Sequence, residues 1–339
     1  MWTDDDRVGS PAPALRGTPE LSGRPCALEP GRWAFATIPR RVGLDRHSVA
    51  FLVAARRLGV SFESTLQIGR ALLPTRVNLT GAFATAGETL TQSQRESILA
   101  EGGGFAEGLF RHLGGQRIDS LDATDWEQST IIHDLNEPLP AEVRAQYSAV
   151  LDTGTLEHVF DFPTALKNCL EAVSVGGHYL SISPANNWCG HGFYQLSPEV
   201  YYRVLAPESG FRVCCLLMRP TRMGAPYYRV SDPAESAVTP GGPWKSLMYT
   251  LACRVSDKEI LAVKPQQHKY AAFWEAERQA PGSHQASSVR RPRARLVAKL
   301  PPSVREPYYE FRRTLKPVMT AAANARELRA RRLHDLSKL

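Results

Sequence analysis

Apolar residues are gathered in short runs that alternate with polar, glycine-containing segments through most of the chain. The runs predict strands at residues 64–68, 117–121, 129–132, 148–152, 178–184, 213–218 and 246–255. Apolar residues that recur every three to four positions predict helices at 45–59, 105–113, 162–173 and 197–205. This alternation predicts an α/β fold with a doubly wound, mostly parallel, seven-stranded sheet and helices on both faces.

Three segments differ in composition. Residues 1–31 are rich in proline, glycine and charge without a hydrophobic period, and we expect no regular structure there. Residues 32–270 form the main domain, with an irregular stretch expected at 71–103. Residues 271–339 carry fifteen Lys and Arg against six Asp and Glu, so the net charge of +7 comes from this segment. We expect a linker at 280–298 and then a basic helical tail, which either packs on the domain or contacts an anionic membrane surface or an acidic partner.

The overall composition is that of an ordinary globular protein, with 43% hydrophobic and 22% charged residues. No apolar run approaches the roughly 18 residues that cross a bilayer. The acidic start of the chain lacks the order of a secretory signal, and we expect a cytoplasmic protein. The main domain is close to neutral, which does not favour a nucleic-acid groove. The six cysteines show no CxxC spacing and predict free thiols.

The most informative segment spans residues 147–211. An apolar run ends in Asp152-Thr-Gly154, and the sequence Thr-Leu-Glu-His-Val follows at 155–159. A helical period then leads to Gly176-Gly177 and a second apolar run. This order predicts strand, loop, helix, turn and strand. It places an acid at the carboxyl end of a strand, where parallel sheets bind ligands.

These residues resemble the class I S-adenosylmethionine-dependent methyltransferases. In that family the corresponding strand ends in Asp, a similar Leu-Glu-His-Val segment follows, and a helix leads to a Gly-Gly turn. The resemblance covers roughly residues 64–255 and is strongest over 122–211. It implies a Rossmann-like fold whose last two strands are antiparallel, and an enzyme that transfers a methyl group from S-adenosyl-L-methionine. We expect a small-molecule or glycan-like acceptor.

The resemblance also implies which residues hold the cofactor. The acid after the second strand, Asp122, would bind both ribose hydroxyls, because a carboxylate accepts two donors at once. Asp134, with Leu135, would lie at the adenine. The methionine end would face the residues after the fourth strand, which are Asp152, Thr153 and Gly154. Aspartate also commonly starts turns and caps helices, so a structural role stays open for each acid.

The loop after the first strand is shorter than the family's usual glycine-rich loop. It reads Gly69-Arg70, with one glycine and no acid, and is similar to a branch that carries a shortened loop. Gly69 would let the backbone approach the cofactor. Arg70 would either face the cofactor's carboxylate, which a guanidinium binds well, or be a surface arginine.

Two histidines are the candidates for proton transfer. His191 lies in a segment of aromatic, polar and glycine residues after the fifth strand, at the expected acceptor site. It is the first candidate general base, because imidazole titrates near neutrality, and His158 is the second. A structural role remains the alternative for both. Cys189 beside His191 could suggest a metal, but no further ligand stands at suitable spacing, and we expect no metal site.

Two other functions compete with methyl transfer. The one-glycine loop is compatible with an inactive methyltransferase-like fold that serves as a binding or scaffolding module. A nicotinamide-dependent oxidoreductase is disfavoured, because no G-x-G-x-x-G sequence follows the first strand. Neither the identity of the acceptor nor the oligomeric state follows from the sequence.

Overall fold

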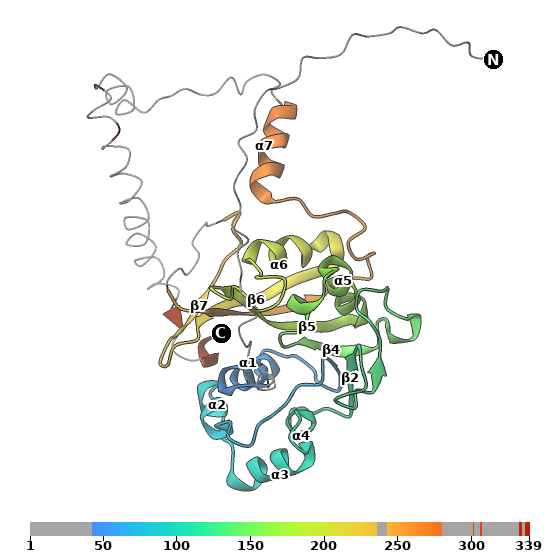
Figure 1. The fold of residues 1–339 in the computed structure, drawn as a ribbon, viewed down its shortest axis with the longest axis vertical. Helices are drawn as coiled ribbons and strands as arrows, with labels where there is room; N and C mark the ends of the chain where they lie inside the picture. Colours follow the sequence, from blue (N-terminus) through green and yellow to red (C-terminus); the bar gives the residue numbers. More distant parts are fainter. Residues whose placement is uncertain (1–42, 236–242, 280–300, 302–305, 307–331, 334–335) are drawn as a thin grey trace, which may run out of the picture. The chain divides into compact units, whose positions relative to one another are not determined.

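The computed structural model describes residues 43–235, 243–279, 301, 306, 332–333 and 336–339. Within these residues, nine strands form one sheet in the order β3-β2-β1-β4-β5-β8-β6-β7-β9 (Figure 1). The strands are β1 (Ser64–Ile68), β2 (Arg117–Asp122), β3 (Ile131–Ile132), β4 (Tyr147–Asp152), β5 (Val173–Asn186), β6 (Phe211–Pro220), β7 (Tyr227–Arg229), β8 (Ser246–Arg254) and β9 (Arg332–Leu333).

The sheet has a parallel half and an antiparallel half. Strands β1 to β5 are all parallel to their neighbours among them. Strand β8 runs antiparallel to both β5 and β6, which confirms the expected antiparallel pair. The α/β class is confirmed, and strands β1 to β5 form the expected parallel part of the sheet. The predicted count of seven strands is wrong, because β7 and β9 extend the edge beyond β6 by antiparallel pairing.

Seven α-helices are present in the described part of the chain. They are α1 (Arg46–Arg57), α2 (Leu79–Thr85), α3 (Gln92–Gly102), α4 (Glu107–His112), α5 (Phe162–Ala172), α6 (Pro198–Val204) and α7 (His268–Gln279). The carboxylate of Asp45 accepts hydrogen bonds from the His47 and Ser48 amides and starts α1, as predicted. Ser197 occupies the N-cap position of α6, but its side chain makes no capping hydrogen bond.

The irregular structure expected at 71–103 is wrong, because α2 and α3 lie in this stretch. A reciprocal capping box between Thr91 and Gln94 starts α3. This helix buries only Ile98 and Gly102, so it has no apolar stripe from which a helical period could be recognised.

Two hydrophobic clusters cover opposite faces of the sheet. Helices α1 to α4 pack on one face with Leu151 of β4, and α5 and α6 pack on the other face with Val150 of the same strand. Figure 1 shows these two sets of helices on opposite sides of the strands. Because successive side chains of a strand point to opposite faces, Asp152 lies on the α5 and α6 side with Val150.

Most of the predicted basic tail, and all of the predicted irregular segment 1–31, lie outside the described residues. At Arg332 and Leu333 the structure has strand β9 in place of the expected helix, whereas Glu306 is helical. Leu336, in the short 3-10 helix η4 (Leu336–Lys338), is 2% exposed in the cluster that contains α1. Among the described residues, no helix has the length and apolar character needed to cross a membrane.

Candidate functional site

The predicted cofactor residues meet at one edge of the sheet. Ile68 at the end of β1 is paired with Leu121 on one side and with Asp152 on the other. Asp122 is paired with Ile132 at the end of β3. The loops after β1, β2, β3 and β4 therefore leave the sheet at the same carboxyl edge.

Asp122 and Asp134 differ in how their carboxyl groups are used. Asp122 is half-buried, and its Oδ1 accepts one hydrogen bond, from the amide of Thr124 at 3.1 Å. Its other oxygen has no partner among the described residues. The exposed Asp134 uses Oδ1 to accept from the backbone and side-chain nitrogens of Asn136, and these hydrogen bonds hold its pKa below the usual value. Leu135 is 5% exposed beneath this turn.

Asp152 is fully buried. Its Oδ1 accepts hydrogen bonds from the amides of Gly154, Thr155 and Leu156, and its Oδ2 accepts one from the Ser181 hydroxyl. Burial raises its pKa to about 6, against the lowering effect of these donors. The side chain shapes the loop after β4 and does not face an open site. The contact of Asp152 with the methionine end of a cofactor stays a prediction. Thr153 and Gly154 are partly exposed on this loop, and Gly154 has a φ of +101°.

Gly69 and Arg70 are both fixed by neighbouring loops. Gly69 has a φ of +73°, and a Cβ atom there would lie 2.7 Å from Oγ1 of Thr155. The guanidinium of Arg70 donates to Oε1 of Glu107 at 2.7 Å and to the carbonyl oxygen of Glu127 at 2.8 Å. Its central carbon also lies 3.9 Å from the centre of the Phe105 ring. These contacts anchor Arg70 to the neighbouring loops, and its contact with a cofactor carboxylate stays a prediction.

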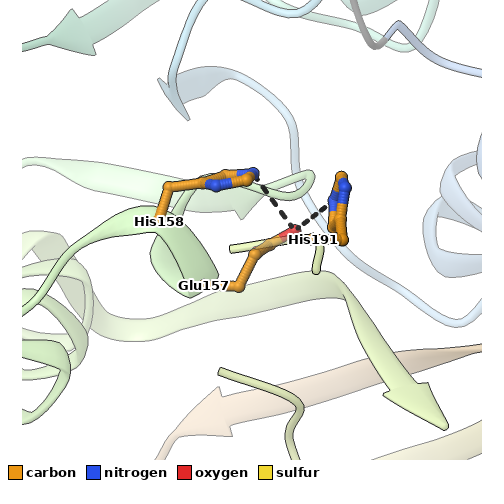
Figure 2. Close-up of side chains that lie close together, drawn as sticks. All are labelled: Glu157, His158 and His191. Atoms are coloured by element: carbon orange, nitrogen blue, oxygen red, sulfur yellow. Dashed lines mark ion pairs between the residues drawn. The ribbon is translucent and has the colours of Figure 1, made fainter. Parts of the chain in front are cut away.

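The two candidate histidines meet at a third residue, Glu157. Nε2 of His191 lies 3.6 Å from Oε1 of Glu157, and Nε2 of His158 lies 4.0 Å from the same oxygen. Figure 2 shows both imidazole rings turned toward this carboxyl group. The ring centres of the two histidines are 5.0 Å apart. We call Glu157, His158 and His191 the Glu-His-His cluster.

The cluster joins two loops of the carboxyl edge. Glu157 and His158 lie in η2 (Leu156–His158), directly after the β4 loop that Asp152 organises. His191 comes from the loop after β5, where its ring lies 4.9 Å from that of Trp188. The Trp188 indole is held by a hydrogen bond to the Ser246 carbonyl oxygen at 2.9 Å. Neighbouring tertiary contacts thus fix both parts of the cluster.

The side chains of the cluster have very different exposures. That of Glu157 is 2% exposed, whereas those of His158 and His191 are 48% and 31% exposed. Burial, and next the charge of Asp152, raise the pKa of Glu157 to about 8. Burial, and next the charge of His191, lower the pKa of His158. A carboxyl at the base of a partly open pair of imidazoles is a pattern typical of functional sites.

Glu157 is not among the functional residues predicted from the sequence, although it lies in the Leu-Glu-His-Val segment. The pairing of Glu157 with His191 depends on a contact between the loops after β4 and β5, which periodicity does not reveal. No further ligand stands at suitable sequence spacing beside Cys189 and His191, but the fold brings ligand atoms of all three cluster residues within 4.8 Å of one another. Cys189 is exposed and lies outside this group.

Two exposed aromatic residues stand beside the cluster. Phe160 follows His158 by two positions, Phe193 follows His191 by two, and their side chains are 71% and 64% exposed. Their rings form an edge-to-face pair with centres 5.5 Å apart. The carboxyl edge therefore combines a titratable cluster with an exposed aromatic surface.

No protein-family model matches the chain, and no curated protein is similar to it in sequence. Similar solved structures include an S-adenosylmethionine-dependent methyltransferase from Aquifex aeolicus, 10% identical, with 59% of this chain and 88% of that chain covered and a TM-score of 0.32. A second is the 1,6-didemethyltoxoflavin-N1-methyltransferase of Burkholderia thailandensis with bound S-adenosylhomocysteine, 12% identical, with 62% and 79% covered and a TM-score of 0.36. A third is the branched-chain polyamine synthase of Thermus thermophilus, 14% identical, with 66% and 60% covered and a TM-score of 0.31.

Proposed function

We propose that this protein is an S-adenosylmethionine-dependent methyltransferase that acts on a small-molecule or glycan-like acceptor. The observation that carries the proposal is the placement of Asp122, Leu135 and Gly154 around the point where the strand order reverses. From β1, the chain builds the sheet outward through β2 and β3 on one side and through β4 and β5 on the other. Ligands of open α/β sheets bind at the carboxyl ends of the strands beside such a reversal.

The residues at this edge are compatible with the proposed cofactor. Asp122 offers a carboxylate oxygen without a protein partner, as a ribose diol requires. Leu135 and Asp134 would lie at the adenine, while Gly69, Thr153 and Gly154 would line the methionine end. Both glycines have positive φ angles and lack side chains, which lets backbone approach a ligand closely. Arg70 and Asp152 would act indirectly by fixing the loops after β1 and β4.

When bound, the cofactor would supply an activated methyl group on a sulfonium ion. The protein has to align the acceptor with that methyl, exclude water and, for a hydroxyl or ammonium acceptor, allow a proton to leave. Proton removal falls to the Glu-His-His cluster at the same edge. Its geometry serves either general-base catalysis at Nε2 of His191, with His158 beside it, or ionisation of the acceptor by a bound cation.

The aromatic pair beside the cluster supports the acceptor class. The exposed rings of Phe160 and Phe193 offer apolar faces on which a flat ring or the apolar face of a sugar can stack. Hydrogen-bonding groups of the cluster would then orient the reactive atom. An extended nucleic-acid acceptor is less compatible with the neutral charge of the main domain.

A binding or scaffolding module remains the second candidate. The observation that favours it is the internal engagement of Arg70, which leaves the short loop after β1 without a group for the cofactor's carboxylate. Isothermal titration of the full chain with S-adenosylmethionine and S-adenosylhomocysteine separates the two functions. We expect saturable binding of both, and no binding of NAD as the control. Absence of binding of either sulfur ligand would refute the methyltransferase proposal in favour of the module.

Transfer itself is tested with radiolabelled S-adenosylmethionine and fractionated small-molecule extracts. We expect label to appear in a low-molecular-weight fraction only when the protein is present. Label that appears in protein or nucleic acid in place of that fraction would contradict the proposed acceptor class.

A further inference from the structure

The Glu-His-His cluster is not held together by hydrogen bonds. The separations of 3.6 Å and 4.0 Å between Oε1 of Glu157 and the two Nε2 atoms exceed those of an N–H···O hydrogen bond. Nevertheless, Nε2 of His158 and Nε2 of His191 both face Oε1 of Glu157, as Figure 2 shows. Such convergence without direct bonding is what a missing common partner would produce.

The second observation concerns the other oxygen of the same carboxyl group. Glu157 is 1% exposed, and its Oε2 has no hydrogen-bond partner among the described residues. A buried carboxylate without donors is costly, and such groups in proteins are normally paired or coordinate a metal. The charge of the nearby Asp152 raises the pKa of Glu157, and no hydrogen bond joins these two carboxyl groups.

We propose that Glu157, His158 and His191 bind one divalent first-row transition-metal cation, of the class of Zn²⁺. Two imidazole nitrogens and a carboxylate oxygen suit Zn²⁺ better than Mg²⁺ and Ca²⁺, which prefer oxygen ligands only. A tetrahedral cation at roughly 2.0–2.2 Å from each ligand holds the ligands about 3.3–3.6 Å from one another. The observed 3.6 Å between His191 and Glu157 already meets this spacing, whereas the 4.0 Å between His158 and Glu157 exceeds it. All three ligand atoms lie within 4.8 Å of one another, so the imidazoles would draw closer around a bound cation.

The surroundings of the cluster suit such a site. The amide of Phe193 donates to the carbonyl oxygen of Glu157 at 2.7 Å and so holds the loop of His191 against η2. Gly192 lies between them, where a Cβ atom would stand 3.1 Å from Nδ1 of His158. The two imidazole nitrogens and the Glu157 oxygen would fill only three coordination positions of the cation. The partial exposure of both imidazoles leaves the remaining positions accessible, as in catalytic rather than structural metal sites.

If a cation binds here, His158 and His191 act as metal ligands and not as general bases. The catalytic consequence, unlike cation binding itself, rests on the proposed function. An acceptor hydroxyl at an open position would lose its proton to solvent more readily, because a cation lowers the pKa of a bound hydroxyl. Its oxygen would then form a bond to the methyl carbon as the bond between sulfur and methyl breaks, leaving S-adenosylhomocysteine.

The test uses the full chain, without an affinity tag that binds metal, after treatment with a chelator and dialysis. Zn²⁺, Mn²⁺, Co²⁺ and Mg²⁺ are titrated separately by calorimetry, and the visible absorption of bound Co²⁺ reports the geometry of the ligands. We expect one equivalent of a transition metal to bind, with Mg²⁺ much weaker, and to raise the melting temperature of the protein.

The variants Glu157→Gln, His158→Ala and His191→Ala should each weaken binding at least as much as the roughly 10–100-fold loss typical of residues that only support metal ligands. Cys189→Ser is the matched control, because this thiol lies in the same loop but outside the cluster, and it should bind as the parent does. Circular dichroism and thermal melts establish that each variant is folded. The proposal is overturned if the folded parent binds no transition metal, or if the three ligand variants bind as tightly as Cys189→Ser.

Titration with S-adenosylmethionine is carried out on the same samples. A protein that binds the cation but not S-adenosylmethionine would support the metal site and refute the proposed function. A protein that binds S-adenosylmethionine but no transition metal would support the proposed function and refute the metal site. The two proposals can therefore fail independently.

Discussion

The backbone amide of Phe193 donates a hydrogen bond to the carbonyl oxygen of Glu157 at a distance of 2.7 Å. The amide of Tyr194 approaches the same oxygen at 3.3 Å. These contacts join the loop after β5 to the short helix after β4, and they bring His191 to the carboxyl group of Glu157. The cluster therefore depends on backbone geometry as much as on its three side chains.

Gly192 is the position where this dependence can be tested. It has a φ of +77°, and an added Cβ atom would lie 2.7 Å from the carbonyl oxygen of Glu157. Gly190 in the same loop has a φ of +80° but no atom within 4 Å of such a Cβ. We expect Gly192→Ala to reduce the free energy of unfolding by about 1–3 kcal/mol more than Gly190→Ala, as overpacking does. Denaturant unfolding of both variants measures the difference, and equal losses would show that only the backbone strain matters.

Asp122 is expected to contribute directly to cofactor affinity. Asp122→Ala should weaken S-adenosylmethionine binding by about 1.5–3 kcal/mol, the usual contribution of hydrogen bonds to a charged group. Asp125→Ala is the control, because Asp125 is an exposed acid of the same loop. Calorimetric titration of parent and variants provides the measurement. If Asp122→Ala and Asp125→Ala bind equally well, Asp122 does not hold the ribose.

His191 is expected to affect turnover more than cofactor binding. His191→Ala should lower methyl transfer by about a hundredfold or more, whether the imidazole acts as a base or as a ligand. The affinity for S-adenosylmethionine should stay nearly unchanged, since Asp122 and Gly154 lie on other loops. Single-turnover assays with radiolabelled cofactor measure the rate. Undiminished transfer in a folded variant would make His191 a structural residue.

Asp152 is expected to contribute to stability. Asp152→Ala would leave the amides of Gly154 and Thr155 without their acceptor in a buried loop. We expect a loss of about 1–3 kcal/mol in the free energy of unfolding, the cost of unsatisfied buried groups. Asp152→Asn keeps an acceptor oxygen and should lose less. A comparable loss in both variants would mean that the charge, rather than the accepted hydrogen bonds, matters.

His47 predicts a pH dependence of stability outside the site. Burial, and next the charge of Arg219, lower the pKa of His47 from 6.5 to about 4. The neighbouring Asp45 opposes this shift, and Tyr227 contacts the ring nitrogen Nδ1 at 3.1 Å. Because the unfolded chain binds this proton more readily, the contribution of neutral His47 is complete above pH 6.5 and is lost as the pH falls toward about 4.

The comparison variant for this effect is His47→Gln, which cannot take up the proton. Unfolding free energies measured between pH 7.5 and pH 4 should fall less steeply for the variant. The difference in slope should stay below about 1.4 kcal/mol per pH unit, the limit for a single proton. Parallel curves for the parent and His47→Gln would contradict the lowered pKa.

Much of the fold could be predicted from local patterns. The segment from β4 through α5 to β5 followed from an apolar run, a helical period and the Gly176-Gly177 turn, because local propensity and tertiary packing agree there. The helix starting at Asp45 followed from its capping residue. By contrast, α3 lacks an apolar stripe, and β7 and β9 are so short that only pairing with distant strands makes them strands.

The candidate site was predictable only in part. Strand ends fixed the placement of Asp122 and Asp134, since the carboxyl ends of parallel strands share one edge. Whether an acid at such an end faces a ligand or its own loop depends on side-chain direction, and Asp152 is turned inward. The role of Glu157 in the site depends on the contact between the loops after β4 and β5, which places His191 beside it. Apolar periodicity carries no information on contacts between two loops.

Strand β9 has a consequence for how the domain folds. Tyr227 of β7 pairs with Leu333, about a hundred residues later in the chain, and Leu336 then enters the core beside α1. Contacts of such long range form slowly, because the chain loses the conformational entropy of the intervening loop before the strand pairing stabilises the sheet. During synthesis, β7 emerges well before its partner. Until residues 332–339 arrive, the nascent domain presents β7 as an open edge to which other extended chains can pair.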